Sequence, residues 1–262
     1  MDWLHMHIGM IILIAVLLYS AGFALAVAGK KNLPFLFFIA GWTVNLAIFA
    51  VNWIYAGEPP FGNMYHVLVF LGLCFMPAYF ILRRVHSLKT GPAYFMVASV
   101  IPLIGAIFMG NDLHWQRVPA LQSNWFVPHV TAYMISYALA AIAFLVMAVR
   151  RLRMIFIKEI SADNAEDSWR ILRLAFPFMT FGMLSGALWA DDAWGTYWSW
   201  DPKETWSLIT WMLYLAFLHC QISSRLRKFA DIPHLFAFMA LLTTFILVNI
   251  LPKLASAFHS YA

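Results

Sequence analysis

The sequence predicts an all-α polytopic membrane protein with about eight transmembrane helices and both termini outside. Three observations lead to this prediction. The 262 residues are 63% hydrophobic and 11% charged, and their mean hydropathy is +0.76, a composition typical of polytopic membrane proteins. Eight stretches approach the length of about 20 mostly apolar residues that a membrane span needs. The cationic residues gather in alternate connections between these stretches.

The eight apolar stretches are separated by short connections, which leave no room for a soluble domain. In chain order they are 5–28, 33–55, 64–82, 92–109, 128–149, 171–190, 205–223 and 233–251. The first helix begins Met1-Asp-Trp-Leu-His without a cationic leader, so we expect a span there and not a cleaved signal peptide. We therefore expect one transmembrane domain over residues 1–262.

The cations predict the orientation. Fourteen of the 17 Lys and Arg lie in or beside alternate connections, and Arg117, Lys203 and Lys253 lie on the other side. Cytoplasmic loops carry the excess of Lys and Arg, so both termini should face outside. We attribute the net charge of +5 to anchoring in the lipid bilayer and expect no nucleic-acid partner.

The two cysteines predict no redox chemistry. Cys74 and Cys220 both lie in apolar stretches and form no CxxC pair. We therefore do not expect them to form a disulfide or to act as a thiol relay. The sequence also contains no CxxCH, so we do not expect covalently attached c-type haem in this chain.

A tryptophan-rich segment over residues 189–206 is the most informative part of the chain. It contains five of the 12 Trp, interleaved with Gly, Tyr and acidic residues. Interfacial aromatic belts scatter Trp over many helix ends, so a belt explains this crowding poorly. Asp201 and Glu204 would be costly inside hydrocarbon. We interpret the segment as an external platform for a large planar ligand at the membrane surface.

Two histidines flank this segment on the predicted outer side. His129 follows Pro128 at the start of the fifth stretch, and His259 follows the eighth. Imidazole is a common axial ligand of haem iron, so the pair suggests a bis-His haem site beneath the indoles. The alternative interpretation is two interfacial histidines at helix ends.

The other histidines are weaker candidates. His219 lies 13 residues beyond Trp206, about 20 Å deeper at 1.5 Å per residue, where a polar residue is a functional candidate. The alternatives are a bond to a neighbouring carbonyl or a side chain that reaches the cytoplasmic face. His66 suits a turn-capping role better than a ligand role, and His114 lies in an interfacial loop. We assign no role to four histidines at span ends: His5, His7, His86 and His234.

These residues resemble a known family. Trp194-Gly-x-x-Trp198-x-Trp200-Asp201 is similar to the "WWD" signature of haem-handling proteins of cytochrome c assembly. Its continuation Pro-Lys-Glu-Thr-Trp206 resembles the CcsA/ResC branch (system II). Similar segments surround His129, His219 and His259, so the resemblance runs from about residue 59 to the end. The family's Pro-x-x-Asn-x-Tyr-Glu ends here in His66 in place of Glu.

The resemblance implies a role in cytochrome c biogenesis. Haem b, bound transiently and non-covalently, would move across or within the membrane and be presented on the outer face. There the thiols of a CxxCH apocytochrome c would add to it, with this chain as the membrane subunit of a haem lyase. His129 and His259 would be axial ligands to the iron and His219 a transient one. The resemblance implies a cofactor-binding role for Trp194, Trp198, Trp200, Asp201 and Trp206.

The resemblance also implies a partner and a location. A CcsB/ResB-like membrane protein would supply an external domain and a second intramembrane histidine. The expected location is a bacterial-type inner membrane or a thylakoid membrane, with the active face extracytoplasmic.

Three other functions are open at this point. A haem chaperone or exporter without ligase activity would use the same residues. A b-type haem subunit of a membrane redox complex would stack two haems between histidines about 13–14 residues apart in single helices, and no stretch here has such a pair. A structural subunit with a vestigial haem pocket would bind no haem.

Overall fold

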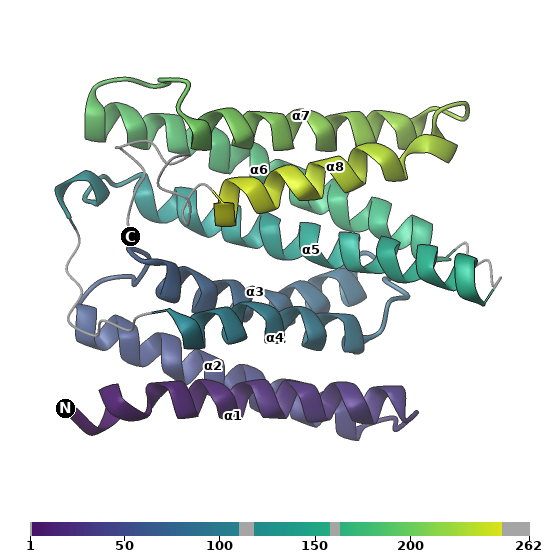
Figure 1. The fold of residues 1–262 in the computed structure, drawn as a ribbon, viewed down its shortest axis with the longest axis horizontal. Helices are drawn as coiled ribbons and strands as arrows, with labels where there is room; N and C mark the ends of the chain where they lie inside the picture. Colours follow the sequence, from purple (N-terminus) through teal and green to yellow (C-terminus); the bar gives the residue numbers. More distant parts are fainter. Residues whose placement is uncertain (1, 110–117, 158–162, 248–262) are drawn as a thin grey trace. The chain divides into compact units, whose positions relative to one another are not determined.

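The computed structural model describes residues 2–109, 118–157 and 163–247, and these residues form helices and no strand. The eight α-helices α1 to α8 correspond to the eight predicted stretches, which confirms the all-helical prediction (Figure 1). The chain divides into two compact units, Met1–Arg117 and Val118–Ala262, and we describe each by itself. The expectation of one domain over 1–262 stays a prediction.

The first unit contains four helices. They are α1 (Asp2–Val27), α2 (Leu33–Ala56), α3 (Met64–Val85) and α4 (Pro92–Phe108). Helix α1 packs against α2 and α4, and α3 packs against α4 and α2. Tyr19 of α1 is fully buried and makes an edge contact with Phe38 of α2. Buried Asn45 of α2 donates to the Val69 carbonyl of α3 at 3.3 Å, so polar groups also join these apolar helices.

Helix α3 begins at a side-chain cap. Asn63 Oδ1 accepts a hydrogen bond from the backbone N–H of His66 at 2.9 Å, the usual way to satisfy a free donor at a helix start. The His66 side chain itself is buried. Asn63 is therefore the capping residue at this corner, and His66 contributes its backbone.

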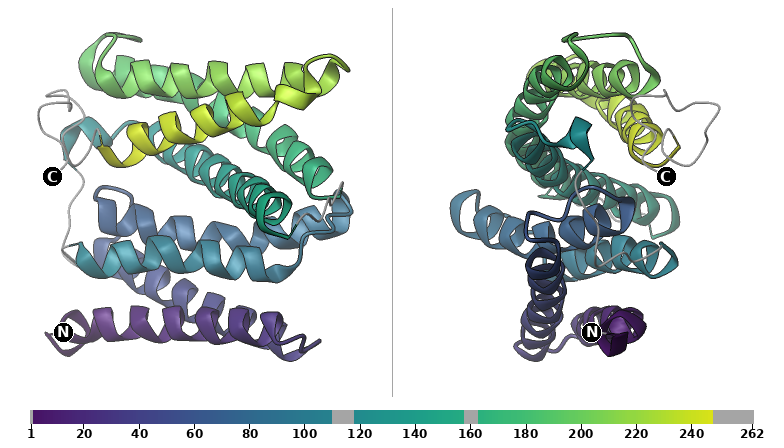
Figure 2. Two further views of the ribbon diagram at one scale, coloured as in Figure 1. Left: turned by 45° about the vertical axis from the view of Figure 1, so that its right-hand side comes forward. Right: turned by 90° about the vertical axis from the view of Figure 1, so that its left-hand side faces the viewer.

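The second unit contains the other four helices. They are α5 (Phe126–Phe156), α6 (Asp163–Trp194), α7 (Pro202–Ile222) and α8 (Asp231–Leu242), and α8 continues into a π-helical segment, Thr243–Leu247. Helix α6 packs against α5 and α7, while α8 lies between α7 and α5 (Figure 2). Two 3₁₀ turns precede α5 and α8, at Pro119–Leu121 and Arg227–Phe229.

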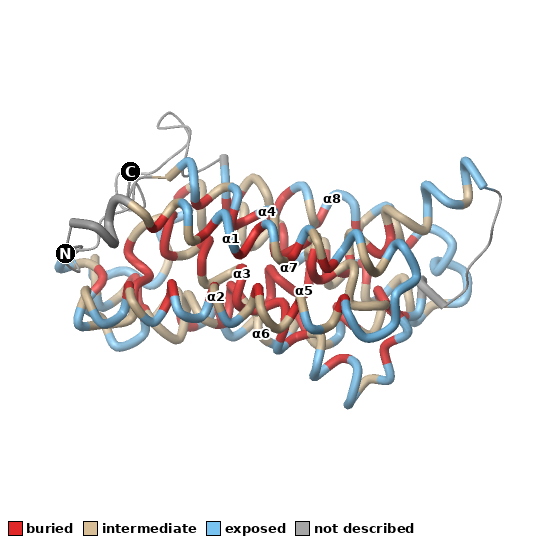
Figure 3. Tube along the Cα trace, turned by 90° about the horizontal axis from the view of Figure 1, so that it is seen from below, coloured by how far each residue is buried: buried red, intermediate tan, exposed pale blue. Residues whose placement is uncertain are grey.

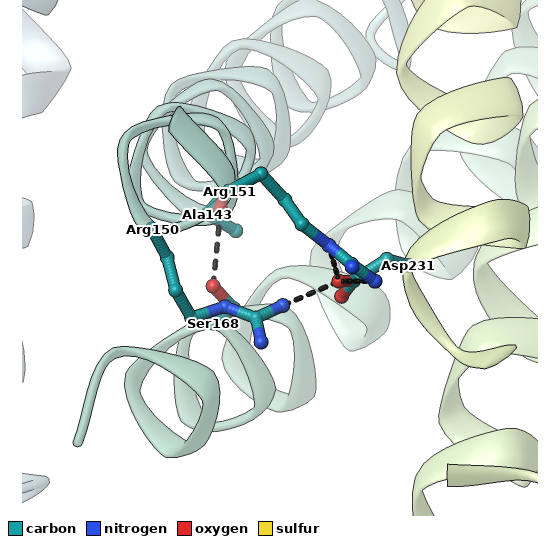
Figure 4. Close-up of polar contacts among 5 residues, drawn as sticks. All are labelled: Ala143, Arg150, Arg151, Ser168 and Asp231. Atoms are coloured by element: carbon teal, nitrogen blue, oxygen red, sulfur yellow. Dashed lines mark hydrogen bonds and ion pairs between the residues drawn. The ribbon is translucent and has the colours of Figure 1, made fainter. Parts of the chain in front are cut away.

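An ion-pair cluster fixes α8 to α5. Asp231 Oδ2 accepts from Arg150 Nη2 and from Arg151 Nε, each at 2.5 Å (Figure 4). Nearby, Ser168 Oγ of α6 donates to the Ala143 carbonyl of α5 at 3.1 Å. These cations belong to the side that the positive-inside rule assigns to the cytoplasm, so we interpret the cluster as a structural clamp at that end of the unit.

The helix surfaces suit a lipid environment. Buried and exposed residues alternate along each helix (Figure 3), yet many exposed side chains are large and apolar. On α1 the exposed residues Met10, Leu13, Ile14 and Leu17 follow the spacing of one helix face. Such a stripe would be unfavourable in water and is favourable against lipid.

Within the described residues, six segments are long and apolar enough to cross a membrane. They are His7–Val27, Leu33–Ala56, Met64–Val85, Phe126–Phe156, Glu166–Trp194 and Arg227–Ile246. Helix α4 has 17 residues, about 26 Å at 1.5 Å per residue, which is short for a core of about 30 Å. Helix α7 is not among the six because Trp, Thr, Tyr, His and Gln interrupt its apolar residues.

The orientation stays a prediction, and reporter fusions test it. With both termini outside, alkaline phosphatase fused after Ala262 should be active, and a fluorescent protein there should be dark. Fusions after Lys31, on the opposite side of one span, should give the reverse pattern and serve as the control. A fluorescent C-terminal fusion would contradict the prediction and place His259 in the cytoplasm.

Candidate functional site

His129 lies in the first turns of α5, the helix that begins at Phe126. Its backbone N–H already donates to the Trp125 carbonyl at 3.0 Å. Pro128 therefore occupies the third helical position, because the helix starts two residues earlier than the sequence suggests. Proline is tolerated there because the first N–H groups of a helix have no partner within it.

The His129 side chain faces α6. Its Nδ1 lies 2.8 Å from the carbonyl oxygen of Gly182. Its ring contacts those of Tyr133 and Trp189, with centroid distances of 5.0 and 5.4 Å. The imidazole is half-buried and held by three neighbours, so its orientation is set by the packing of α5 against α6.

Trp189 organises the aromatic cluster around His129. It is buried, and its Nε1 donates to the Ala120 carbonyl at 2.7 Å. Its ring also contacts Trp194 at 5.0 Å and Phe126 at 5.5 Å. Trp189 thus connects the turn before α5 to the last turns of α6. Ser123 Oγ adds a second link by donating to Asp192 Oδ2 at 2.6 Å.

The tryptophan-rich segment 189–206 has a helix–loop–helix structure. Residues 189–194 complete α6, residues 195–201 form a loop, and α7 starts at Pro202. The sequence indicated no helical period here, because Trp and acidic residues alternate with Gly and Tyr. Residues at the two ends of the loop explain why two helices are nevertheless present in this segment. Gly195 adopts φ 75°, a conformation typical of a helix end, and Asp201 caps the next helix.

Asp201 and Glu204 form a capping box. Asp201 Oδ1 accepts from the backbone N–H groups of Lys203 at 2.7 Å and Glu204 at 2.9 Å. Glu204 Oε2 accepts from the backbone N–H of Ser199 at 2.8 Å and of Asp201 at 3.3 Å. Such a cap contributes about 1 kcal/mol. The carboxylates therefore order the loop from within, while a direct role of Asp201 in cofactor binding stays a prediction.

Trp198 and Trp200 lie next to each other in the loop. Their ring centroids are 5.7 Å apart and the rings are nearly perpendicular. Trp200 adopts φ 61° and is 68% exposed; such a conformation costs a non-Gly residue roughly 1–2 kcal/mol. Strained residues tend to occur at functional sites. The folded loop therefore contains a strained backbone conformation at Trp200, and the indole of this residue is exposed.

The charged residues predicted on the outer side include Lys203, in the first turn of α7 before the predicted span 205–223. Burial lowers the pKa of Lys203 to about 8, although nearby Asp201 opposes this shift. Arg117 and Lys253 lie outside the described residues. Trp206 lies one turn further along α7 and is half-buried.

His219 differs from the sequence expectation. It lies in the last turn of α7, its side chain is exposed, and its Nδ1 lies 2.8 Å from the carbonyl oxygen of Leu215. The sequence suggested that it would face protein or a cavity. Two residues earlier, Phe217 is buried, and two residues correspond to about 200° around a helix. The bond to a neighbouring carbonyl is thus present, and the role of His219 as a transient haem ligand stays a prediction.

His234 is a buried histidine to which the sequence assigns no role. It is fully buried in α8, with ring contacts to Phe144, Tyr214 and Phe217 at 6.1, 5.9 and 5.0 Å. Neither ring nitrogen has a hydrogen-bond partner among the described residues. The sequence places His234 near the end of a predicted span. It contains no local pattern that shows which side of α8 is buried.

The structure brings together part of the predicted site. His129, Trp189 and Trp194 form one connected cluster, and Trp198 and Trp200 form a pair in the adjoining loop. His219 lies at the other end of α7 from that loop. His259 and His114 lie outside the described residues, so the pairing of His129 with His259 stays a prediction.

The sequence and the fold match known proteins. The family model described as Cytochrome C assembly protein matches residues 61–255. Cytochrome c biogenesis protein CcsA of Mesostigma viride is 30% identical over 291 residues, which cover 96% of this chain and 93% of the relative. CcsA of Chlamydomonas reinhardtii is 37% identical over 186 residues, 66% of this chain and 53% of that protein.

A solved structure of Cytochrome c Heme Lyase CcmF is similar in fold, with a TM-score of 0.58 at 19% identity. The match covers 92% of this chain and 46% of that one, so this chain spans less than half of its length. At this identity the likeness concerns the fold alone. The family match and the near full-length relative are sufficient for assignment: this chain belongs to the CcsA family of cytochrome c assembly proteins.

Proposed function

We propose that this multi-pass membrane protein of cytochrome c biogenesis presents haem b on its outer face for attachment to a CxxCH apocytochrome c. One observation carries the proposal. The imidazole of His129 is held by α6 inside an aromatic cluster that extends to Trp194, the last residue of α6 before the loop 195–201. Haem is the substrate in this proposal, and the chain binds and positions it.

The described residues fit such a ligand. A carbonyl oxygen can only accept, so Nδ1 of His129 carries the hydrogen, and Nε2 of the neutral ring has the lone pair that a metal needs. Indoles of the loop supply flat apolar surface for a large ring. Nε1 of Trp198 is buried with no hydrogen-bond partner within the described part of the chain. It can therefore donate to a polar group of a ligand.

Each part of the site has a distinct task in this proposal. His129 and His259 would bind the haem iron, with His259 assigned from the sequence resemblance alone. Trp194, Trp198, Trp200 and Trp206 hold the ring, and Asp201 keeps the loop in place through its cap. Among the cations predicted on the outer side, Lys203 lies within the described residues and is the candidate that could pair with a haem propionate. The chain thereby supplies positioning, and the chemistry comes from the bound group.

The bound haem supplies two vinyl groups to which two cysteine thiols add, each sulfur bonding to one vinyl carbon while the thiol proton goes to its neighbour. Each addition is balanced and needs no oxidant or external reductant. This chain's residues would hold the ring and the iron and would leave the vinyl groups accessible to the acceptor.

His219 suits a separate step of haem delivery. Its bond to the Leu215 carbonyl leaves the lone pair on Nε2, and its side chain is exposed on α7. A membrane partner of the CcsB/ResB type would approach this face and supply the second histidine. We therefore propose His219 as a transient ligand on the route to the outer site, in a bacterial-type inner membrane or a thylakoid membrane.

Co-expression with an acceptor tests the function. The chain and its CcsB/ResB-type partner should attach haem to an exported CxxCH acceptor, detected as haem staining that survives denaturation. A CxxAH acceptor should carry one thioether and an AxxAH acceptor none. Haem transfer to the acceptor without thioethers would instead support a chaperone or exporter. Absence of both haem binding and attachment would contradict the proposal.

A further inference from the structure

Two glycines of α6 face the imidazole of His129 and its neighbour Tyr133. They are Gly182 and Gly186, one helical turn apart. A Cβ on Gly186 would lie 2.5 Å from His129 Cε1 and 2.6 Å from its Nδ1. A Cβ on Gly182 would lie 3.0 Å from Tyr133 Cδ2. Helix α5 can approach α6 this closely only because both positions lack a side chain.

The same approach fixes the protonation of the ring. The Gly182 carbonyl oxygen lies 2.8 Å from Nδ1 of His129, so Nδ1–H is the donor, and in the neutral ring Nε2 has the lone pair. The carbonyl can reach the ring because no Cβ of Gly186 occupies the intervening space. The contacts with Trp189 and Tyr133 restrict the other directions in which the ring could turn.

We propose that Gly182 and Gly186 are positioning residues that form a notch for the imidazole and select the tautomer in which Nε2 binds iron. The proposal rests on the proposed function, because it takes His129 as an iron ligand. Groups that orient a metal-binding histidine through its other nitrogen typically change metal affinity 10–100-fold when altered. In this protein the orienting group is the backbone carbonyl of Gly182, which binds Nδ1 of His129.

Gly186→Ala separates positioning from folding. Alanine in a helix interior is otherwise more favourable than glycine by about 1 kcal/mol, so the change should not weaken the helix itself. Its methyl group would occupy the place of the ring and push Nδ1 away from the Gly182 carbonyl. We expect roughly 10–100-fold weaker haem binding, with a change from low-spin to high-spin iron in the bound fraction.

Gly9→Ala is the matched control. Gly9 lies within α1, and a Cβ there would meet nothing within 4 Å. This variant should keep the wild-type haem spectrum. Gly182→Ala should give an intermediate result, because its Cβ meets the edge of Tyr133 at 3.0 Å and the ring can give way slightly.

The test uses the full chain purified with its membrane partner. Absorption spectra of oxidised and reduced protein report haem per folded chain and spin state, with and without millimolar imidazole. Imidazole should restore low-spin haem in Gly186→Ala, as free ligand replaces the displaced ring. Loss of haem together with loss of folded protein, without rescue, would indicate ordinary packing damage and overturn the proposal. A wild-type spectrum in Gly186→Ala would also overturn it.

A second measurement does not depend on haem. The ¹⁵N spectrum of haem-free protein with labelled histidine, assigned through His129→Gln, should show the Nδ1–H tautomer for His129. Gly186→Ala should alter that signal. If the tautomer is as proposed while His129→Gly keeps normal low-spin haem, the iron-ligand assignment is wrong and the notch is only structural. An Nε2–H tautomer in wild-type protein would overturn the inference while leaving the proposed function open.

Discussion

Replacing His129 with glycine is expected to abolish cytochrome c maturation, and added imidazole is expected to restore part of it. The side chain sits between Trp189, Tyr133 and the glycine notch of α6. Its removal leaves a space of the same shape as free imidazole. A small ligand that enters this space can offer a nitrogen lone pair in nearly the same place. Haem per folded chain and acceptor haem attachment are the two measurements.

His259→Gly should behave in the same way, because the proposal gives both residues the same task. His86→Gly is the control. His86 is the C-terminal cap of α3 in the other unit and has no part in the proposed site, so haem content should be unchanged and imidazole without effect. Normal low-spin haem in both His129→Gly and His259→Gly would show that neither is an iron ligand.

The double change Trp198→Ala and Trp200→Ala is expected to release haem while the protein still folds and inserts. Trp200 is largely exposed, and the two rings contact each other in the loop. The loop ends depend on Gly195 and on the Asp201–Glu204 cap, which the substitution leaves intact. Alanine at Trp200 also leaves the backbone strain in place, so stability should change little.

The measurement is haem content divided by folded protein yield. Trp53→Ala is a suitable control, because Trp53 of α2 is 45% exposed and lies in the other unit. It should leave the ratio unchanged. If the loop indoles serve only as an interfacial belt, the double variant should lose insertion or stability, while each folded molecule keeps its haem. That outcome would remove these residues from the binding site.

The sequence by itself determined which segments are helices and which family the chain resembles. Apolar stretches of span length depend on composition alone, so their positions in α1 to α8 follow from the order of residues. The tryptophan-rich signature is equally local, and the family match over residues 61–255 confirms it. The loop boundaries were also available in principle, because Gly195 and the Asp201–Glu204 pair are standard end signals.

Only the tertiary structure decided which face of each helix is buried. In a soluble helix, polar residues mark the solvent side, but lipid-facing and core-facing side chains are both apolar here. The composition of a helix therefore does not predict how the helix is rotated about its axis. His219 proves exposed and His234 buried for this reason, although both lie in apolar stretches of similar appearance.

The glycine notch is another feature that the sequence alone could not predict. Gly182 and Gly186 lie four positions apart on α6, a spacing that occurs in many membrane helices. That His129 occupies the space beside them depends on how α5 packs against α6, a contact between residues more than 50 positions apart. The sequence could propose His129 as a ligand. Its orientation and tautomer follow from helix packing, because a backbone carbonyl of another helix holds the ring.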